Sequence, residues 1–304
     1  GVGAILGAPF MLATIAMFLV GLSVLYFASR RTFGAEMHFN NISTRRDLTF
    51  FLVGYTLALL AALIHNRTVS ISIGIALVLL YLLYLYRSLK SGELIETEEL
   101  DELHLGGVVE KRLDFLPIVD ENSNQASDPH RILVVAQTLF ALGIIIAGAH
   151  LFVDEVVWFS EEILHIPVAV VALIIAPLAT ELPEKFNSVI WISRDKDTLA
   201  LGNITGAMAF QGTLPVTLGI LFTSWNLSLS WGSTAFLNGF SAILAIVSGG
   251  ILYMRARNVA EGNMKPLPFL AGGLFYLLFI IVLIYHVMNY DLRVGFEAFI
   301  GLFP

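Results

Sequence analysis

The chain has 304 residues, of which 57% are hydrophobic and only 13% are charged, and its mean hydropathy is +0.81. A soluble domain has about 25% charged residues, so this composition argues against a soluble protein and indicates a membrane protein. The net charge of −7 gives no indication of nucleic-acid binding. The absence of cysteine excludes disulfides and thiolate metal sites.

Eight apolar stretches follow one another along the chain, each long enough to cross a hydrocarbon core of ~30 Å as a helix. The stretches are Gly3–Phe27, Leu48–Ile64, Val69–Tyr86, Leu133–Val153, Pro167–Ile192, Thr198–Phe222, Thr234–Met254 and Phe269–Val287. The alternating pattern of a membrane β-barrel is absent. The predicted fold class is therefore an all-α membrane protein with eight transmembrane helices.

Lysine and arginine in the loops predict the orientation of these helices. Basic residues are concentrated after the first, third, fifth and seventh stretches, whereas the loops between them hold only Arg67. This alternation predicts a multi-pass protein of the inner or plasma membrane, with the lipid bilayer as its surroundings. The long acidic loop of residues 91–131 would then be cytoplasmic. The sequence leaves the oligomeric state open.

The acidic run in that loop comprises Glu93, Glu96, Glu98, Glu99, Asp101 and Glu102. It lacks the spacing of an EF-hand, which requires a glycine at loop position 6 and a glutamate at position 12. We expect a solvated linker that joins two halves of the protein, with a calcium sensor as the alternative.

Two segments of the chain resemble each other, residues 3–21 and residues 202–220. At an offset of 199 they share five identities, which are Gly3/Gly202, Ile5/Ile204, Gly7/Gly206, Ala8/Ala207 and Thr14/Thr213. By the loop charges, the first copy crosses the membrane from outside to inside and the second in the opposite direction. This arrangement is typical of the inverted repeats of secondary transporters. Because small residues are common in membrane helices, chance similarity is the alternative.

The repeat predicts three parts: residues 1–90 as a first repeat of three helices, 91–131 as the linker, and 132–304 as a second repeat of five helices. The stretch at 3–27 corresponds to the third stretch of the second repeat. We therefore expect two further helices before Gly1, equivalent to 133–153 and 167–192. The complete fold would be a ten-helix, five-plus-five antiporter.

Across the eight stretches, Glu181, Glu184 and Lys185 are the deeply placed charges. Ionisable residues at membrane depth are costly, and they indicate a functional site by default. Pro183 lies among them and removes one helical hydrogen bond, which is expected to free the carbonyl of Ala179.

Helical spacing sorts the polar side chains of this segment. Thr180, Glu184 and Asn187 or Ser188 fall on one face, and Glu181 and Lys185 form an i,i+4 pair on the adjacent face. Carboxylate, hydroxyl and amide oxygens suit a hard cation. A single lysine cannot neutralise two carboxylates, so Glu184 is expected to be the principal ligand.

The next helix contributes further polar residues. The predicted cation site comprises Glu184, Thr180, Glu181, Asn187, Gln211 and Asn203. Glycines at 3, 7, 202 and 206 are expected to let the two repeated helices cross closely beside it. The structural alternative is a Glu–Lys pair that ties helices together, with the amides as helix–helix contacts.

These residues carry a resemblance to a known family. The stretch "ATELPEKFNSVIWISRDKDTLALGNITGAMAFQG" resembles the second α-repeat of the calcium/cation antiporter superfamily, especially its bacterial sodium:calcium antiporter-like branch. The matching positions are Thr180, Pro183, Glu184, Gly202, Asn203, Gly206 and Phe210. The resemblance covers most of residues 133–225 and, through the repeat, residues 3–28.

The resemblance implies that Glu184 and Thr180 are ion ligands. The sequence also departs from the family pattern. Glu181 replaces a serine, Met208 replaces an asparagine or aspartate, and Gln211 replaces the last asparagine of the motif. These departures leave the counter-ion open between Na⁺ and H⁺.

The expected function is a secondary active cation antiporter that exports Ca²⁺ in exchange for Na⁺ or H⁺ by alternating access. The protein is not expected to be an enzyme, and no cofactor is expected besides the transported ions. One alternative is a cation channel, and another is a cation/proton exchanger without calcium specificity. A membrane enzyme is the least favoured reading, because no His-rich metal motif or G-x-S-x-G nucleophile is present.

Overall fold

The structure, a computed structural model, describes residues 2–90, 131–164, 168–227, 230–231, 233–258 and 262–287. These residues are helical apart from one short β pair, irregular helix ends and the connections. The elements in chain order are α1 (Val2–Met11), π-helix η1 (Leu12–Ala16), α2 (Met17–Phe27), β1 (Met37–His38), α3 (Asn41–Leu63), α4 (Arg67–Lys90), α6 (Arg131–Trp158), π-helix η3 (Phe159–Leu164), α7 (Val168–Thr180), α8 (Leu182–Ser193), α9 (Asp197–Gln211), α10 (Leu214–Phe222), α11 (Thr234–Arg257), β2 (Asn263–Met264) and α12 (Leu267–Val287). The predicted acidic linker lies outside the described residues, save Arg131.

Within the described parts of the chain, seven helical segments are long and apolar enough to cross a membrane. This confirms the predicted all-α membrane fold. The fifth predicted span, Pro167–Ile192, differs from the prediction. It consists of two shorter helices, α7 and α8, which are separated at Glu181, and Pro183 lies in the first turn of α8. A proline is tolerated there because the first backbone N–H groups of a helix have no partner within it.

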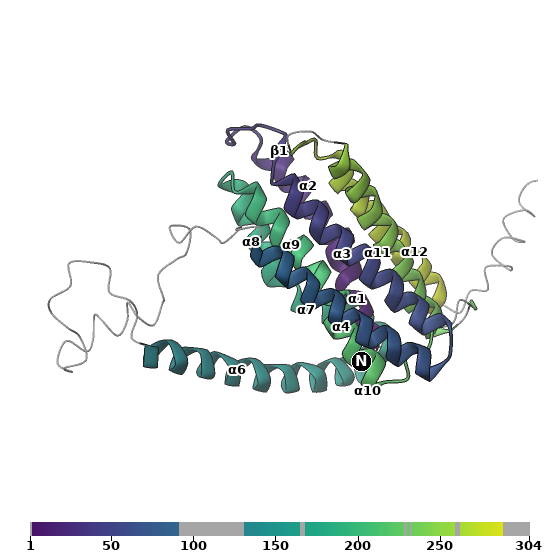
Figure 1. The fold of residues 1–304 in the computed structure, drawn as a ribbon. Helices are drawn as coiled ribbons and strands as arrows, with labels where there is room; N and C mark the ends of the chain where they lie inside the picture. Colours follow the sequence, from purple (N-terminus) through teal and green to yellow (C-terminus); the bar gives the residue numbers. More distant parts are fainter. Residues whose placement is uncertain are drawn as a thin grey trace, which may run out of the picture.

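The helices other than α6 form a slanted bundle, with α2, α3, α11 and α12 running side by side (Figure 1). Two interrupted helices, α1–η1–α2 and α9–α10, cross this bundle. Helix α3 packs against α9, and α4 packs against α10. In the same way α11 packs against α1, and α12 packs against α2. The helices that follow each interrupted helix therefore pack against the interrupted helix of the other half.

The two interruptions also correspond in detail. In the first, the Thr14 hydroxyl donates to the Phe10 carbonyl at 2.6 Å, and in the second, the Thr213 hydroxyl donates to the Ala209 carbonyl at 2.8 Å. Both pairs of residues are related by the offset of 199 that relates the two sequence segments. A threonine hydroxyl that bonds four residues back competes with the regular backbone ladder, which favours an irregular turn.

One end of the bundle, which we call the β-ribbon end, is held together by polar contacts. There β1 pairs antiparallel with β2. The fully buried guanidinium of Arg31 forms ion pairs with Asp197 and, at 3.5 Å, with Asp195. Asp197 also accepts the His38 backbone N–H at 2.9 Å. Three connections, between α2 and α3, α8 and α9, and α11 and α12, therefore meet at this end.

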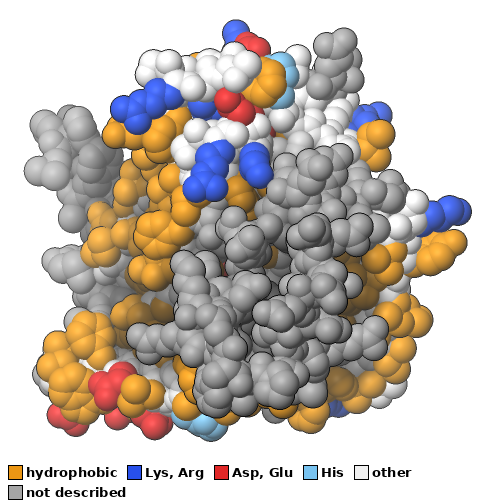
Figure 2. All heavy atoms as spheres, turned by 90° about the vertical axis from the view of Figure 1, so that its left-hand side faces the viewer, with side chains coloured by type: hydrophobic (Ala, Val, Ile, Leu, Met, Phe, Trp, Pro, Cys, Tyr) orange, Lys and Arg blue, Asp and Glu red, His pale blue; other side chains and the backbone are white. Residues whose placement is uncertain are grey.

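Most basic residues gather at the β-ribbon end. Figure 2 shows most of the visible Lys and Arg side chains at the upper end of the molecule, beside a few Asp and Glu side chains, and further Asp and Glu side chains at the lower left, with hydrophobic side chains between. The basic residues in the loops and helix ends at the β-ribbon end are Arg30, Arg31, Arg45, Arg46, Arg87, Lys90, Arg194, Lys196, Arg255, Arg257 and Lys265. Arg67 lies at the opposite end, beside the last turn of α10. The predicted segregation of basic loops thus corresponds to the two ends of the bundle.

Helix α6 contains the predicted span Leu133–Val153, but it does not run beside the other helices. It lies across the lower end of the bundle and extends away from it (Figure 1). Its described side chains are exposed along nearly the whole length. The helix is apolar on all sides, so it has no polar face and no distinct apolar stripe to select one packing surface.

Gly7, Gly202 and Gly206 do not carry the predicted close crossing of the two repeated helices, although Gly7 lies at a close approach to another helix. A Cβ at Gly7 would lie 2.6 Å from Cγ of Pro177, so α1 and α7 approach closely there. A Cβ atom added at Gly202 would have no neighbouring heavy atom within 4 Å. At Gly206 the nearest atom is the Tyr84 hydroxyl at 3.5 Å, an ordinary contact. Of these three glycines only Gly7 lies at a close helix approach, and it meets α7 rather than the second repeated helix.

Replacing Gly7 by alanine is expected to lower the thermal stability of the detergent-solubilised protein. The added methyl group would overlap the α7 backbone, a clash that costs about 1–3 kcal/mol. The matched control is Gly202→Ala, which adds the same methyl group to a helix where space is open and where alanine favours the helix. Melting curves of the two variants should move in opposite directions. Equal melting temperatures would show that α1 and α7 do not touch at Gly7.

Candidate ion site

The α7–α8 break places Glu181 between two helices. Glu181 has φ −93° and ψ 6°, outside regular helix geometry. Its backbone N–H still donates to the Pro177 carbonyl at 3.1 Å, and its carbonyl accepts from the Lys185 N–H at 3.3 Å. The two helices therefore remain connected by backbone hydrogen bonds, while the axis is interrupted among the polar residues.

Glu181 is buried, with 4% of its surface exposed. Its Oε1 atom accepts hydrogen bonds from the Gln211 amide at 2.8 Å and from the Thr180 hydroxyl at 3.2 Å. Its second oxygen, Oε2, is enclosed and has no hydrogen-bond partner. Thr180, Glu181 and Gln211 are thus brought together as the sequence predicted, around one carboxylate that retains a free acceptor.

Glu184 and Lys185 lie in the first turn of α8. Glu184 is half-buried, and its Oε2 atom is enclosed without a partner. Lys185 is 4% exposed, and its ammonium likewise has no hydrogen-bond partner. The predicted close pair between Glu181 and Lys185 is absent from the described ion pairs, which extend to 4.0 Å. The reason is that Gln211 and Thr180 hold the Glu181 carboxylate, although Lys185 still interacts electrostatically with both glutamates.

Asn203 joins α9 to α8. Its amide donates to the Glu184 backbone carbonyl at 3.1 Å and to the Ser188 hydroxyl at 3.3 Å. Ser188 in turn donates to the Ala200 carbonyl at 3.0 Å. Ser188 was not among the predicted site residues, although its position four residues after Glu184 was available as a signal. Asn187, which was among them, has an exposed side chain on α8.

Asp47 is a further buried carboxylate, and it lies directly before the predicted apolar stretch Leu48–Ile64. Asp47 is 3% exposed. It lies within helix α3, which begins at Asn41, seven residues before the predicted start at Leu48. Its Oδ2 atom accepts from the Thr205 hydroxyl at 2.8 Å, and its Oδ1 atom accepts from Arg46 at 3.2 Å. Both oxygens are satisfied, so this carboxylate joins helices and leaves no free ligand atom.

Four enclosed polar atoms at and beside the α7–α8 break have no hydrogen-bond partner. They are Glu181 Oε2, Glu184 Oε2, Gln211 Oε1 and Lys185 Nζ. Among the residues that the structure describes, no three or more Asp, Glu or His side chains are grouped so that they alone could hold a metal ion. A cation held here would therefore use two carboxylates together with neutral oxygens. We call these four side chains the polar cluster.

An apolar cavity of about 260 Å³ reaches the polar cluster. It is lined by Ala4, Ile5, Ala8, Ala176, Pro177, Thr180, Phe210, Gln211 and Pro215. Thr180 and Gln211 are its polar residues, and both donate to Glu181. The cavity therefore lies beside the buried carboxylate, between the two interrupted helices and α7.

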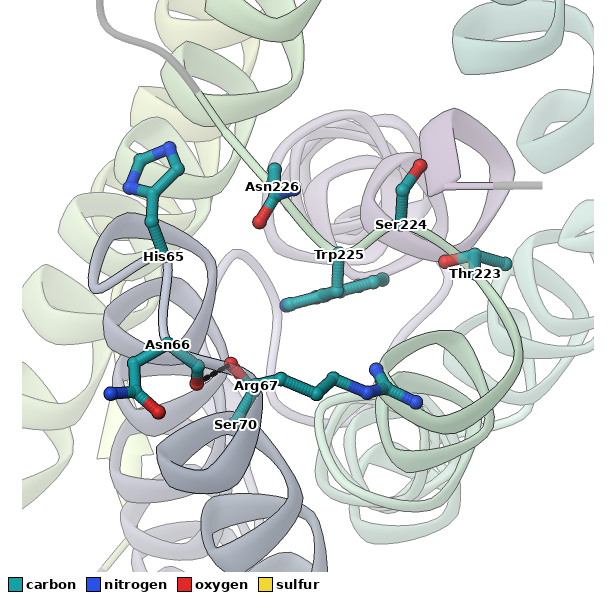
Figure 3. Close-up of a pocket in the computed structure, with 8 residues that line it drawn as sticks. All are labelled: His65, Asn66, Arg67, Ser70, Thr223, Ser224, Trp225 and Asn226. Carbon is teal, nitrogen blue, oxygen red and sulfur yellow. Dashed lines mark hydrogen bonds between the residues drawn. The ribbon is translucent and has the colours of Figure 1, made fainter.

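A second cavity, of about 290 Å³, lies at the end of the bundle opposite the β-ribbon end (Figure 3). Its lining residues are His65, Asn66, Arg67, Ser70, Thr223, Ser224, Trp225 and Asn226. Arg67 extends from the start of α4 to the end of α10, where it donates to the carbonyls of Ile220 and Leu221. Without a carboxylate and with a guanidinium present, this cavity does not suit a cation.

Replacing Gln211 by leucine is expected to destabilise the protein. The change removes the amide that donates to Glu181 and leaves a buried carboxylate oxygen with one donor fewer, which costs about 1–3 kcal/mol. The comparison variant is Asn187→Leu, whose side chain is exposed and which should leave the melting temperature nearly unchanged. Melting temperatures of the purified variants test this, and equal stability for both would argue against the Gln211–Glu181 contact.

Comparisons with known proteins bear on this site. A search of curated proteins found no match. Among solved structures, the fold is similar to one titled "Crystal Structure of H+/Ca2+ Exchanger CAX", with a TM-score of 0.66 and 17% sequence identity. The match covers 97% of this chain and 70% of that one. The profile of the family described as sodium/calcium exchanger protein matches residues 133–288, which is just over half of the chain and includes the polar cluster. The chain therefore belongs to the sodium/calcium exchanger family.

Proposed function

We propose that this protein is a secondary active cation antiporter that exports Ca²⁺ in exchange for Na⁺ or H⁺. Family membership and an antiporter fold support the general class of cation antiporter. The proposal adds the exported ion, the exchange reaction and the residues that carry it.

The observation that carries the proposal is the set of unpartnered oxygens at the α7–α8 break. Glu181 Oε2, Glu184 Oε2 and Gln211 Oε1 are enclosed by protein without hydrogen bonds. Buried polar atoms almost always have partners, so several free acceptors in one cluster favour a bound ligand. Carboxylate and amide oxygens are the ligands that Ca²⁺ prefers.

Glu184 is the principal transport carboxylate in this proposal. No hydrogen bond to its carboxylate is described, whereas one oxygen of Glu181 is already held by Gln211 and Thr180. Glu181, Thr180, Gln211 and Asn203 act as further ligands or hold those ligands in place, and the exposed Asn187 is a peripheral ligand at most. The counter-ion competes for the same carboxylates, so occupancy by one ion excludes the other.

We further propose that residues 1–90 and 132–304 are two inverted repeats joined by a cytoplasmic linker in a plasma or inner membrane. Support comes from the corresponding contacts of the two interrupted helices. Their opposite directions add to it, because α2 ends where α9 begins, at the β-ribbon end. Under this proposal the β-ribbon end is cytoplasmic, since it holds the basic residues. Alternating access would move the two interrupted helices relative to the rest of the bundle.

The test is Ca²⁺ uptake by the full-length protein in vesicles under an imposed Na⁺ or H⁺ gradient. Glu184→Gln keeps the shape of the side chain and removes its charge, and it should abolish uptake because Ca²⁺ requires charged oxygen ligands. Glu181→Gln should reduce uptake but leave it measurable.

The matched control for this test is Arg194→Gln, which removes the charge of an exposed side chain at the end of the same helix and should retain most of the uptake. Full uptake in Glu184→Gln, with loss in Glu181→Gln, would reverse the two roles. Uptake that is independent of any gradient would indicate a channel instead of an antiporter.

A further inference from the structure

Lys185 lies on the inner face of α8. The buried residues of this helix are Lys185, Ser188 and Ile192, which recur at i, i+3 and i+7. This face packs against α9 and α2. The side chain of Lys185 therefore points into the bundle and not toward lipid. Only 4% of the surface of this residue is exposed.

The ammonium of Lys185 has no hydrogen-bond partner in this position. A buried charge without a partner is strongly destabilising, so a lysine here requires negative charge nearby. Glu181 lies one helical turn before Lys185, and Glu184 directly precedes it, so these two carboxylates are the negative charges nearest to the ammonium along the chain. Each of them has one enclosed oxygen that is also unpartnered.

We propose that the Lys185 ammonium is a resident cation of the ion site. In the empty transporter it balances part of the charge of Glu181 and Glu184, and it must move away from them when Ca²⁺ binds. This inference rests on the proposed function, because it assumes that the two glutamates receive a transported cation. It adds that a side chain of the protein itself competes with that cation.

The charges of the site support this assignment. Two carboxylates alone carry a charge of −2, which would attract a monovalent ion such as Na⁺ whenever Ca²⁺ is absent. With the ammonium in place the charge is −1, and the attraction for a monovalent ion is reduced. Displacing an ammonium on a flexible four-carbon stem is feasible, because such a stem can adopt several conformations. Lys185 therefore acts as a specificity-determining residue that disfavours Na⁺ and weakens Ca²⁺ binding.

The test compares Ca²⁺ binding by the purified full-length protein and by Lys185→Met at a constant pH, in choline and in Na⁺ solutions. Methionine keeps an unbranched side chain only one atom shorter than that of lysine, and it removes the charge. Loss of the competing ammonium should tighten Ca²⁺ binding in choline about tenfold or more, as expected for removing one nearby charge. It should also make Ca²⁺ binding sensitive to Na⁺. The unmodified protein should be nearly insensitive to Na⁺, so this inference selects H⁺ as the counter-ion of the proposed exchange.

Two control variants make the result specific. Lys265→Met removes a charge from an exposed lysine at the β-ribbon end and should change neither quantity. Lys185→Met combined with Glu181→Gln should show a smaller gain in Ca²⁺ affinity than Lys185→Met shows alone, because a carboxylate that the ammonium balances is also lost. If Lys185→Met does not fold, Lys185→Gln provides the same neutralisation with a polar side chain.

The outcomes separate this inference from the proposed function. A lysine that serves only to hold the helices would give weaker or unchanged Ca²⁺ binding on removal, and either result would overturn the inference while Ca²⁺ transport by the unmodified protein stands. Tighter binding together with new Na⁺ sensitivity would support it. If the unmodified protein neither binds nor transports Ca²⁺, the proposed function fails and the inference fails with it.

Discussion

The hydrogen bond from Gln211 to Glu181 is the contact on which the arrangement of the site depends. A carboxylate in an apolar bundle must find a donor or a cation, and the donor here belongs to the last residue of α9, directly before the second interruption. Because one oxygen of Glu181 is taken by Gln211 and Thr180, the other remains available. The same contact removes the carboxylate from direct pairing with Lys185. The break in α7–α8 and the end of α9 are thus joined through a single side-chain amide.

Each interrupted helix is stabilised by contacts from neighbouring helices. In the first interruption, the Ala13 carbonyl accepts the Ser248 hydroxyl of α11 at 2.6 Å. In the second interruption, α3 packs closely against the Gly212 carbonyl oxygen. A Cβ atom added at Gly54 of α3 would lie only 3.1 Å from that oxygen. Irregular backbone is tolerated at membrane depth where neighbouring helices satisfy or cover the freed groups. Each half of the chain therefore supports the irregular helix of the other half, and neither half packs independently.

Much of this organisation could be predicted from the sequence. The length and apolar content of each stretch predicted the helices, and the grouping of Arg and Lys matched the ends of the bundle. The polar cluster was also predictable, because Glu181, Glu184 and Lys185 stand out in an apolar segment. The sequence indicated that Pro183 would disturb this segment, but not that two separate helices would result. A hydropathy profile averages over many residues, so it cannot distinguish one long helix from two short helices joined at a polar break.

The errors concern side-chain direction and partner choice. Sequence spacing placed Lys185 against Glu181, but a donor from a distant helix took that carboxylate instead. Asp47 was assigned to a loop because the polar first turns of α3 carry no hydropathy signal. Gly202 and Gly206 resembled helix-crossing positions, yet only the tertiary packing decides which glycine lies at a close approach. Each error involves a contact between residues far apart in the chain, which local patterns do not encode.

The division of one span into α7 and α8 has a consequence for how the protein enters the membrane. Helix α7 has 13 residues, too few to cross ~30 Å of hydrocarbon alone. The first turn of α8 carries two charged residues, Glu184 and Lys185, each of which disfavours insertion by about 2.5–3.5 kcal/mol near the membrane centre. Insertion of this segment into lipid on its own is therefore unfavourable. Because the Gln211 and Asn203 amides of α9 contact its polar residues, we expect α7–α9 to integrate together as a helical hairpin.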